Sequence, residues 1–349
     1  MRKVSSVTPS LKYELNGLHQ VVVQKGNVAT KYIYALQQLA KGTDTVVYRA
    51  RKDGFNAQFT KGEKHFRLFL KGAKKSGTAG SHTQTWEYAG PNGNGEWFIG
   101  TKPKKLSSSK YYWATQIARV KFQNKKYTKN TQMPRLSALN RAGAGYDDNV
   151  VYPGVNLLRS EAAVSPNYLD MLIVTIDTSG TAHFGFYSVN EINKALNGGP
   201  TNYPLDQFRC SYAFKIENFT SAVGSIQGFD IDDKKNIYIS SEAAPKTDDV
   251  GQGVAQDRYI YKIPYGYQKL PNGLVDWNST ENWHRINLNA NNNDHNNGSV
   301  LDRSKFVTEF ESIQVINKND AYLTVSYHDA TTLKTLHSRI YEITWNDPE

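Results

Sequence analysis

The chain has 349 residues, of which 39% are hydrophobic and 12% aromatic, and its 42 Lys and Arg outnumber its 32 Asp and Glu. The resulting net charge of +10 favours polyanionic partners such as nucleic acid, anionic lipid or the teichoic acids of a Gram-positive wall. No run approaches 18 consecutive apolar residues, which excludes a membrane-spanning helix, and a single cysteine, Cys210, excludes an intrachain disulfide.

The N-terminal segment carries Arg2 and Lys3 but lacks the apolar stretch that a signal peptide needs. A leader already removed, another export route and an intracellular protein all stay open at this point. Residues 11–15, LKYEL, alternate between apolar and polar side chains and are predicted to form a strand.

From residue 18 onward the chain divides into five units of three or four strands, which begin near residues 18, 82, 159, 225 and 312. Each unit opens with a strand that starts at a polar residue, followed by a turn rich in Gly, Asn, Asp or Lys and by a more apolar strand. The predicted first strands are residues 20–24, 84–89, 161–166, 227–232 and 314–317. The second strands are residues 31–36, 96–101, 170–176, 236–240 and 321–327. The third strands are residues 45–51, 111–122, 182–189, 258–264 and 337–345, and the fourth strands 65–70, 208–214 and 284–288.

This fivefold pattern predicts an all-β fold, a five-bladed β-propeller that forms one domain over residues 1–349. The second unit lacks a clear fourth strand, and residues 11–15 are expected to supply the outer strand of the last unit and so close the ring. Residues 189–198, VNEINKALNG, are expected to form a short helix that ends at Gly198. The alternative, a β-sandwich, gives no reason for five repeats of the same strand pair.

The segments that define the repeat also resemble a known family. QVVVQKGNVATKYIYALQ, HTQTWEYAG, GEWFIGTKPKK, PRLSALNRAG, SIQGFDIDDKKNIYISS and ESIQVINKNDAYLTVSYH resemble, in order and spacing, the helveticin J family of large, heat-labile (class III) bacteriocins of lactobacilli. The resemblance implies a protein that is secreted or associated with the cell surface and that kills related Gram-positive bacteria. It implies no set of catalytic residues.

Five polar side chains open the five first strands, and in a propeller those strands line the central channel. Amides both donate and accept hydrogen bonds and suit sugar hydroxyls, so this set is a candidate ligand site, with hydrogen bonding between blades as the alternative. The five residues are Gln20, Gln84, Glu161, Gln227 and Gln314.

A glycosidase needs two carboxyl groups that converge on the scissile bond. The set of five contains only Glu161, and Glu311, three residues before Gln314, is its candidate partner at the rim. These two residues are therefore the candidate catalytic groups of a hydrolase that acts on peptidoglycan.

Two further motifs are candidate sites. Asp230, Asp232 and Asp233 begin like a calcium loop but lack the central Gly and the distal Glu of an EF-hand, so a polar turn explains them more simply. Trp277 and Trp283 lie in a polar segment, DWNSTENWH, and are candidate contacts for a ligand, with anchoring of the loop as the alternative.

The sequence favours a binding-type antibacterial protein that recognises wall glycan or teichoic acid. Its densest basic cluster spans residues 102–129, without a helix-turn-helix, RRM or zinc pattern, so nucleic acid is not the expected partner. No cofactor is expected. The wall hydrolase and a surface-associated carbohydrate-binding or adhesion protein without killing activity are the alternatives.

Overall fold

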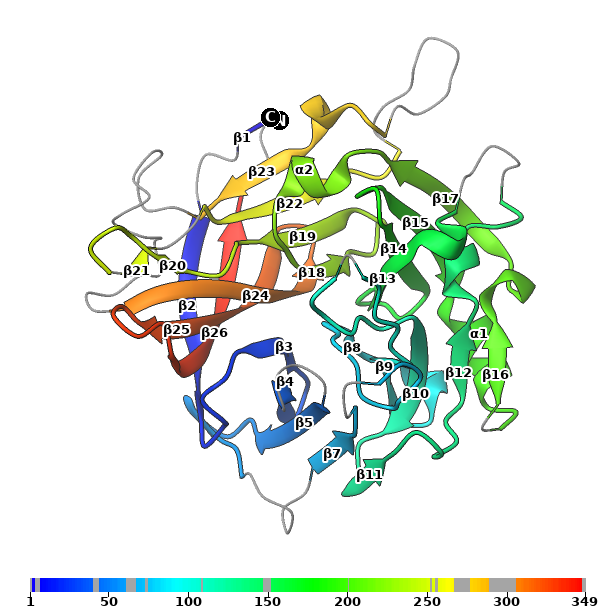
Figure 1. Cartoon of the computed structure of the whole chain (residues 1–349), viewed down its shortest axis with the longest axis horizontal. Helices are drawn as coiled ribbons and strands as arrows, with labels where there is room; N and C mark the ends of the chain where they lie inside the picture. Colours follow the sequence, from blue (N-terminus) through cyan, green and yellow to red (C-terminus); the bar gives the residue numbers. More distant parts are fainter. Residues whose placement is uncertain are drawn as a thin grey trace.

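Five sheets surround a central axis in the computed structural model, as Figure 1 shows in a view close to that axis. The fold is the predicted five-bladed β-propeller, and the β-sandwich alternative is wrong. The structure describes residues 2–3, 7–39, 44–60, 67–72, 75–107, 109–146, 152–199, 201–251, 253–254, 257–266, 277–288 and 306–346.

Each blade has four antiparallel strands, which follow one another outward from the axis. The first blade contains β3 (Val23–Val28), β4 (Tyr32–Leu39), β5 (Asp44–Arg51) and β7 (Arg67–Leu70). The second contains β8 (Trp86–Tyr88), β9 (Glu96–Thr101), β10 (Gln116–Lys121) and β12 (Arg135–Ser137), and the third β13 (Leu157–Val164), β14 (Asp170–Asp177), β15 (Ala182–Ser188) and β17 (Cys210–Ile216). The fourth contains β18 (Ile226–Ile231), β19 (Ile237–Ser241), β22 (Tyr259–Ile263) and β23 (His284–Asn287). The fifth contains β24 (Phe306–Asn317), β25 (Asp320–Asp329), β26 (Thr335–Trp345) and β2 (Val7–Asn16).

The ring is closed between the two ends of the chain. β2 pairs antiparallel with β26 over residues from Val7 to Leu15, which include the predicted residues 11–15. Because the outer strand of the last blade comes from the N-terminal part of the chain, opening this blade requires breaking a long hydrogen-bonded ladder.

A short parallel strand from the following blade covers the outer edge of four of the blades, a feature that the sequence did not predict. β6 (Asn56–Gln58), β11 (Lys125–Tyr127) and β16 (Asn202–Pro204) each lie between the third and fourth strands of their own blade and pair with the fourth strand of the preceding blade. β1 (Arg2–Lys3) precedes β2 and pairs in the same way with β23. Each such strand ties two neighbouring blades together.

The connection between β22 and β23 lies against the third blade in the corresponding place. Trp277 stacks on Phe214 of β17 with ring centroids 3.8 Å apart, and the Asn278 side chain accepts a hydrogen bond from the Glu217 backbone. All five blades are therefore contacted at their outer edge by the next blade in the sequence.

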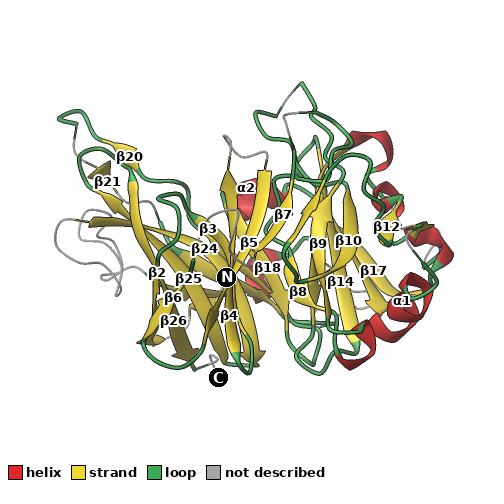
Figure 2. Cartoon of the chain, turned by 90° about the horizontal axis from the view of Figure 1, so that it is seen from below, coloured by secondary structure: helices red, strands yellow, loops and turns green. Residues whose placement is uncertain are grey.

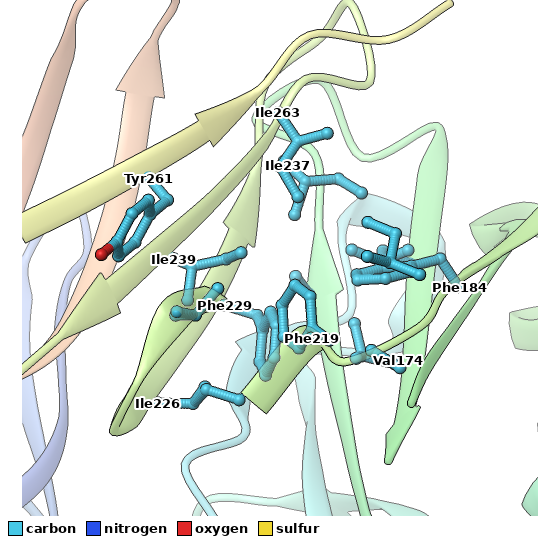
Figure 3. Close-up of a cluster of buried hydrophobic side chains, with 14 of the residues drawn as sticks. Val174, Phe184, Phe219, Ile226, Phe229, Ile237, Ile239, Tyr261 and Ile263 are labelled. Carbon is cyan, nitrogen blue, oxygen red and sulfur yellow. The ribbon is translucent and has the colours of Figure 1, made fainter. Parts of the chain in front are cut away.

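The hydrophobic core consists of five clusters, each shared by two neighbouring blades. Figure 3 shows the cluster between the third and fourth blades, where Phe184 and Val174 of one blade face Phe219, Phe229 and Ile239 of the other. Since each sheet buries both faces, its central strands are apolar on both sides, which explains the continuous apolar runs of the predicted second strands.

The helical segments gather mainly at one side of the ring (Figure 2). The predicted helix forms as α1 (Val189–Leu196), whose N-terminus is capped by the Ser188 hydroxyl, and α2 (Phe219–Val223) was not predicted. The second blade departs most from expectation, because its third strand begins only at Gln116 and its fourth strand is the short β12. Of the predicted strand 65–70, residues 65 and 66 lie outside the described residues. The remaining short elements are η1 (Pro91–Gly93), η2 (Leu139–Arg141), η3 (Gly154–Asn156), η4 (Leu205–Gln207), η5 (Thr280–Asn282), β20 (Lys246–Thr247) and β21 (Gly253–Val254).

Candidate functional site

The innermost strands β3, β8, β13, β18 and β24 lie side by side around the axis and contact one another in a closed ring. Side chains bridge the gaps between them: the Gly26 backbone donates to the Ser312 hydroxyl over 3.0 Å, and the Val28 backbone to Gln314 over 2.7 Å. The strands therefore run in the same direction, so their first residues meet at one end of the axis and their last residues at the other.

A cavity lies at each end of the axis. The first has a volume of about 850 Å³ and is lined by residues near the starts of the innermost strands, including Gln24, Arg159, Gln227 and Glu311. The second has a volume of about 690 Å³, and each innermost strand contributes at least one residue near its end to the lining. These residues include Asn27, Glu87, Val164, Asp230 and Gln314.

The predicted set of five polar residues is only partly brought together. Gln84, Glu161 and Gln227 lie beside the first cavity, where Gln84 donates to Gln227 over 3.2 Å. Gln20 is exposed and precedes β3, and Gln314 lies at the second cavity because β24 begins well before it, at Phe306. The sequence alignment is therefore wrong in the first and fifth blades.

Gln24 and Glu311 take the places that were assigned to Gln20 and Gln314. Both line the first cavity together with Gln227. Counted back from the last ladder pair of the first hairpin, Gln24 lies four residues before Val28, as Gln227 lies four before Ile231. The count is three for Glu161 and six for Glu311, so neither the hairpins nor the amide side chains give this register.

β-bulges mark the first cavity. The ladders of β3, β13, β18 and β24 each skip residues at this level, and the skipped residues include Gln24, Leu158, Gln227 and Glu311. All four line the cavity. Bulges redirect a side chain away from its ladder position and occur often beside functional sites, so the backbone here is shaped to present side chains to the cavity.

Arg159 lines the first cavity and connects neighbouring blades. Its guanidinium donates to the Ile226 carbonyl over 3.1 Å, to Glu161 over 3.2 Å and to the side-chain oxygen of Gln84. One side of the guanidinium lies 4.1 Å from the centre of the Trp113 ring. A buried cation with donors satisfied in this way fixes the second, third and fourth blades relative to one another.

Glu161 is fully engaged by the protein. One or both of its oxygens accept from the Thr85 hydroxyl over 2.6 Å, the Thr83 hydroxyl over 3.1 Å and the Gln84 backbone, besides the contact with Arg159. The structure therefore places this candidate catalytic residue in a blade-to-blade hydrogen-bond network.

Glu311 has a different environment. It is buried, and its Oε2 accepts no hydrogen bond from the described residues. Burial together with the neighbouring carboxyls of Glu309 and Glu242 raises the pKa of Glu311 well above the usual range. Glu242 is paired with Arg258 at 2.9 Å and Glu309 lies 3.1 Å from His328, whereas no cation is paired with Glu311 among the described residues. Burial raises the pKa of Glu242 as well.

An aromatic wall faces these carboxyls across the first cavity. Trp113 packs edge-on against His82 at 4.2 Å, and His82 lies 4.7 Å from Tyr111, whose side of the wall is exposed. Burial and the charge of Arg159 lower the pKa of His82 to about 3, so the imidazole is neutral at physiological pH. The wall is thus an uncharged aromatic surface.

Lys25, Glu87 and Asp230 form a buried polar cluster on the axis between the two cavities, here called the Lys25 plug. Lys25 Nζ contacts Glu87 at 2.7 Å and donates to the Ile313 carbonyl over 2.7 Å, and the charge of Asp230 acts on both. Burial raises the pKa of Glu87 to about 8 and that of Asp230 to about 6. At neutral pH the buried Lys25 is therefore balanced by one ionised carboxylate, Asp230, which also accepts from the Val315 backbone.

The candidate metal ligands Asp232 and Asp233 accept hydrogen bonds from neighbouring protein groups. Asp232 accepts hydrogen bonds from Lys234, Asn236 and Tyr238 and so forms the polar turn, while Asp233 accepts from the Asn167 backbone. Within the described part of the chain, no group of three or more His, Cys, Asp or Glu side chains is arranged to hold a metal ion.

Neither tryptophan lies free in a polar loop. Trp283 directly precedes β23 and is buried in the cluster between the third and fourth blades, so its indole cannot contact a ligand there. Trp277 is half-buried, stacked on Phe214, and donates from its indole nitrogen to the Tyr212 hydroxyl. Both placements agree with the alternative of loop anchoring. The long polar stretch beyond, residues 289–305, lies outside the described residues.

Part of the basic cluster at residues 102–129 lies beside the first cavity, where Lys110 belongs to the lining. Lys104, Lys105 and Lys110 are exposed in the connection between β9 and β10, which also carries Tyr111 and Trp113. Lys104 bonds through its backbone to Trp113, and Lys110 Nζ lies 4.9 Å from the centre of the Tyr111 ring. None of the helices in the described ranges is long and apolar enough to cross a membrane.

Two solved structures are distantly similar to the chain. An α-L-arabinofuranosidase from Podospora anserina, solved with cellotriose, is 12% identical with a TM-score of 0.39, and the match covers 99% of this chain and 92% of that one. A protein of unknown function from Dyadobacter fermentans is 10% identical with a TM-score of 0.38, over 90% of this chain and 72% of that one. At these values nothing about the activity of the chain follows from either.

Sequence comparison gives a much stronger result. The family model described as bacteriocin helveticin-J matches residues 3–346. Bacteriocin helveticin-J from Lactobacillus helveticus is 38% identical, and the match covers 99% of both chains. The resemblance seen in the sequence is confirmed, and the chain belongs to the helveticin J family of bacteriocins.

Proposed function

We propose that the protein is a secreted bacteriocin that binds the wall or surface of related Gram-positive bacteria and kills them. The observation that carries the proposal is the 38% identity to bacteriocin helveticin-J over 99% of both chains. The net charge of +10 supports an anionic surface as the target, because a wall that carries teichoic acid attracts a basic protein.

The test combines killing and binding. The purified protein is added to lactobacilli and to an unrelated Gram-negative strain, and viable cells are counted, while its binding to isolated walls is measured by sedimentation. Loss of viability in the lactobacilli only, with saturable wall binding, is the expected result. Wall binding without killing would instead favour the adhesion protein.

A wall hydrolase is the second candidate, favoured by Glu311. A buried carboxyl that lines a cavity and has a raised pKa suits a general acid, and Glu309 lies in the same strand. Against this activity, Glu161 is engaged in hydrogen bonds between blades. Release of reducing sugars from purified wall, abolished in Glu311→Gln with wall binding retained, would establish hydrolysis. No release from wall under conditions that kill cells would exclude it.

A further inference from the structure

The first axial cavity has the chemistry of a site for an uncharged polyhydroxylated ligand. Its volume of about 850 Å³ lies within the range of small-molecule sites. Its bulged strands place the side chains of Gln24 and Gln227 at the cavity, and an amide can donate and accept at once. The Gln227 amide already accepts from Gln84 and donates to the Glu242 carbonyl, which leaves Gln24 as the amide of this pair for a ligand. Gln38 adds a third amide, buried in the wall, whose nitrogen and oxygen have no hydrogen-bond partner among the described residues.

The charges around this cavity disfavour a charged occupant. An anion would meet Glu309, and a cation would meet Arg159, whose guanidinium already donates to three protein acceptors. The histidine of the wall is neutral, and burial raises the pKa of the innermost carboxyl, Glu311, which favours its uncharged form. Uncharged hydroxyl and acetamido groups are compatible with these neighbours.

The aromatic wall supplies the other half of a sugar site. Tyr111 and Trp113 line the same cavity as the amides, and Tyr111 is 37% exposed. The apolar face of a sugar ring packs on such side chains, while its hydroxyl groups reach the amides. The second cavity lacks this arrangement, because its Gln314 amide is bonded at both ends to the Val28 backbone and its floor is the Lys25 plug.

Exposed positive charge lies beside the aromatic wall. Lys104, Lys105 and Lys110 are exposed in the same connection that carries Tyr111, Lys110 lines the cavity, and none of the three forms an ion pair within the described ranges. We propose that the first cavity binds an uncharged sugar unit of a wall polymer and that these three lysines bind an anionic group, such as a phosphate, of the same polymer. The inference depends on the proposed wall binding and names the site and ligand class behind it.

The test measures dissociation constants for isolated lactobacillus walls at low and high salt. Tyr111→Ala is expected to weaken binding at least about tenfold at both salt concentrations, because it removes a packing contact that salt does not screen. Lys104→Glu/Lys105→Glu/Lys110→Glu is expected to weaken binding at low salt and to remove most of its salt dependence. Walls stripped of phosphodiester-linked polymers with hydrofluoric acid should lose binding of the wild-type protein.

Matched controls keep structural damage apart from loss of the site. Tyr152→Ala removes an equally exposed tyrosine that does not line the cavity, and Lys52→Glu/Lys234→Glu/Lys334→Glu changes the net charge equally at other exposed positions. If Tyr111→Ala binds walls as tightly as the wild-type protein does, the sugar site is overturned while the proposed wall binding stands. Full binding to stripped walls would overturn the anionic part, and no wall binding by the wild-type protein would overturn both this inference and the proposed function.

Discussion

Glu87 at the centre of the axis makes the stability of the protein depend on pH in a defined direction. Its pKa is raised from 4.5 to about 8, chiefly by burial and against the attraction of Lys25. The folded state therefore holds this proton more tightly than the unfolded state does. The contribution of this proton to the free energy of unfolding is fully present below pH 4.5 and is lost as the pH rises through 8.

The magnitude follows from the shift. Each pKa unit corresponds to about 1.4 kcal/mol, so the whole shift is worth up to about 5 kcal/mol, of which about 3 kcal/mol is lost between pH 6 and pH 9. Glu87→Gln keeps an oxygen that can accept from Lys25 but cannot ionise. The free energy of unfolding of this variant is thus expected to rise relative to wild type by about 3 kcal/mol between pH 6 and pH 9.

Urea unfolding followed by tryptophan fluorescence at pH 6, 7, 8 and 9 measures this difference. Glu242 and Glu311 also have raised pKa values and lower the stability of both proteins at high pH, so the difference between the two curves is the relevant quantity. Glu281→Gln, at an exposed position, is the control and should give a curve parallel to wild type. Parallel curves for wild type and Glu87→Gln would refute the assignment of a buried, protonated Glu87.

Three further substitutions test the fold around the site, each by urea unfolding at pH 7. Arg159→Met should lower the free energy of unfolding by about 3–5 kcal/mol, because it leaves Glu161 buried without its cation, and a change below 1 kcal/mol would contradict the role of Arg159 in connecting neighbouring blades. Gly26→Ala should cost about 1–3 kcal/mol, since the added methyl carbon would lie 2.3 Å from the Thr324 hydroxyl, and wild-type stability would show that β3 and β25 can move apart. Trp283→Ala should cost about 3–5 kcal/mol without altering wall binding by the folded fraction, whereas weaker binding by a fully folded variant would restore Trp283 as a ligand contact.

The propeller could be predicted from the sequence because its second strands are unambiguous. β14 and β25, for example, are buried on both faces and read as apolar runs bounded by turns. The closing strand could also be predicted, since LKYEL at residues 11–15 alternates clearly. The parallel edge strands could not: β6, β11 and β16 have three residues each, too few for a periodic pattern, and their partners lie in another blade.

The site was harder to predict because the signal that locates it is a break in the pattern. The ladder of β18 skips Gln227, and this interruption of the alternation is what brings its side chain to the axis. In β24 the skipped positions lie between Phe310 and Ile313. An alignment based on amide side chains therefore misses these bulges and selects Gln314 in the fifth blade and Gln20 in the first.

The same bulges explain how a closed ring of blades can present a cavity at all. In a regular strand, side chains alternate between the two neighbouring blades, and both directions are filled by the five hydrophobic clusters. Interruptions of the ladder beside the first cavity release side chains from this alternation, and these side chains line the cavity. At the second cavity the ladder of β24 is interrupted again, at Ile316, and Gln314 and Asp230 hydrogen-bond the backbone of the next blade. The second end of the axis thus ties neighbouring blades together, whereas at the first end four of the five innermost strands leave the ladder and present side chains to a cavity.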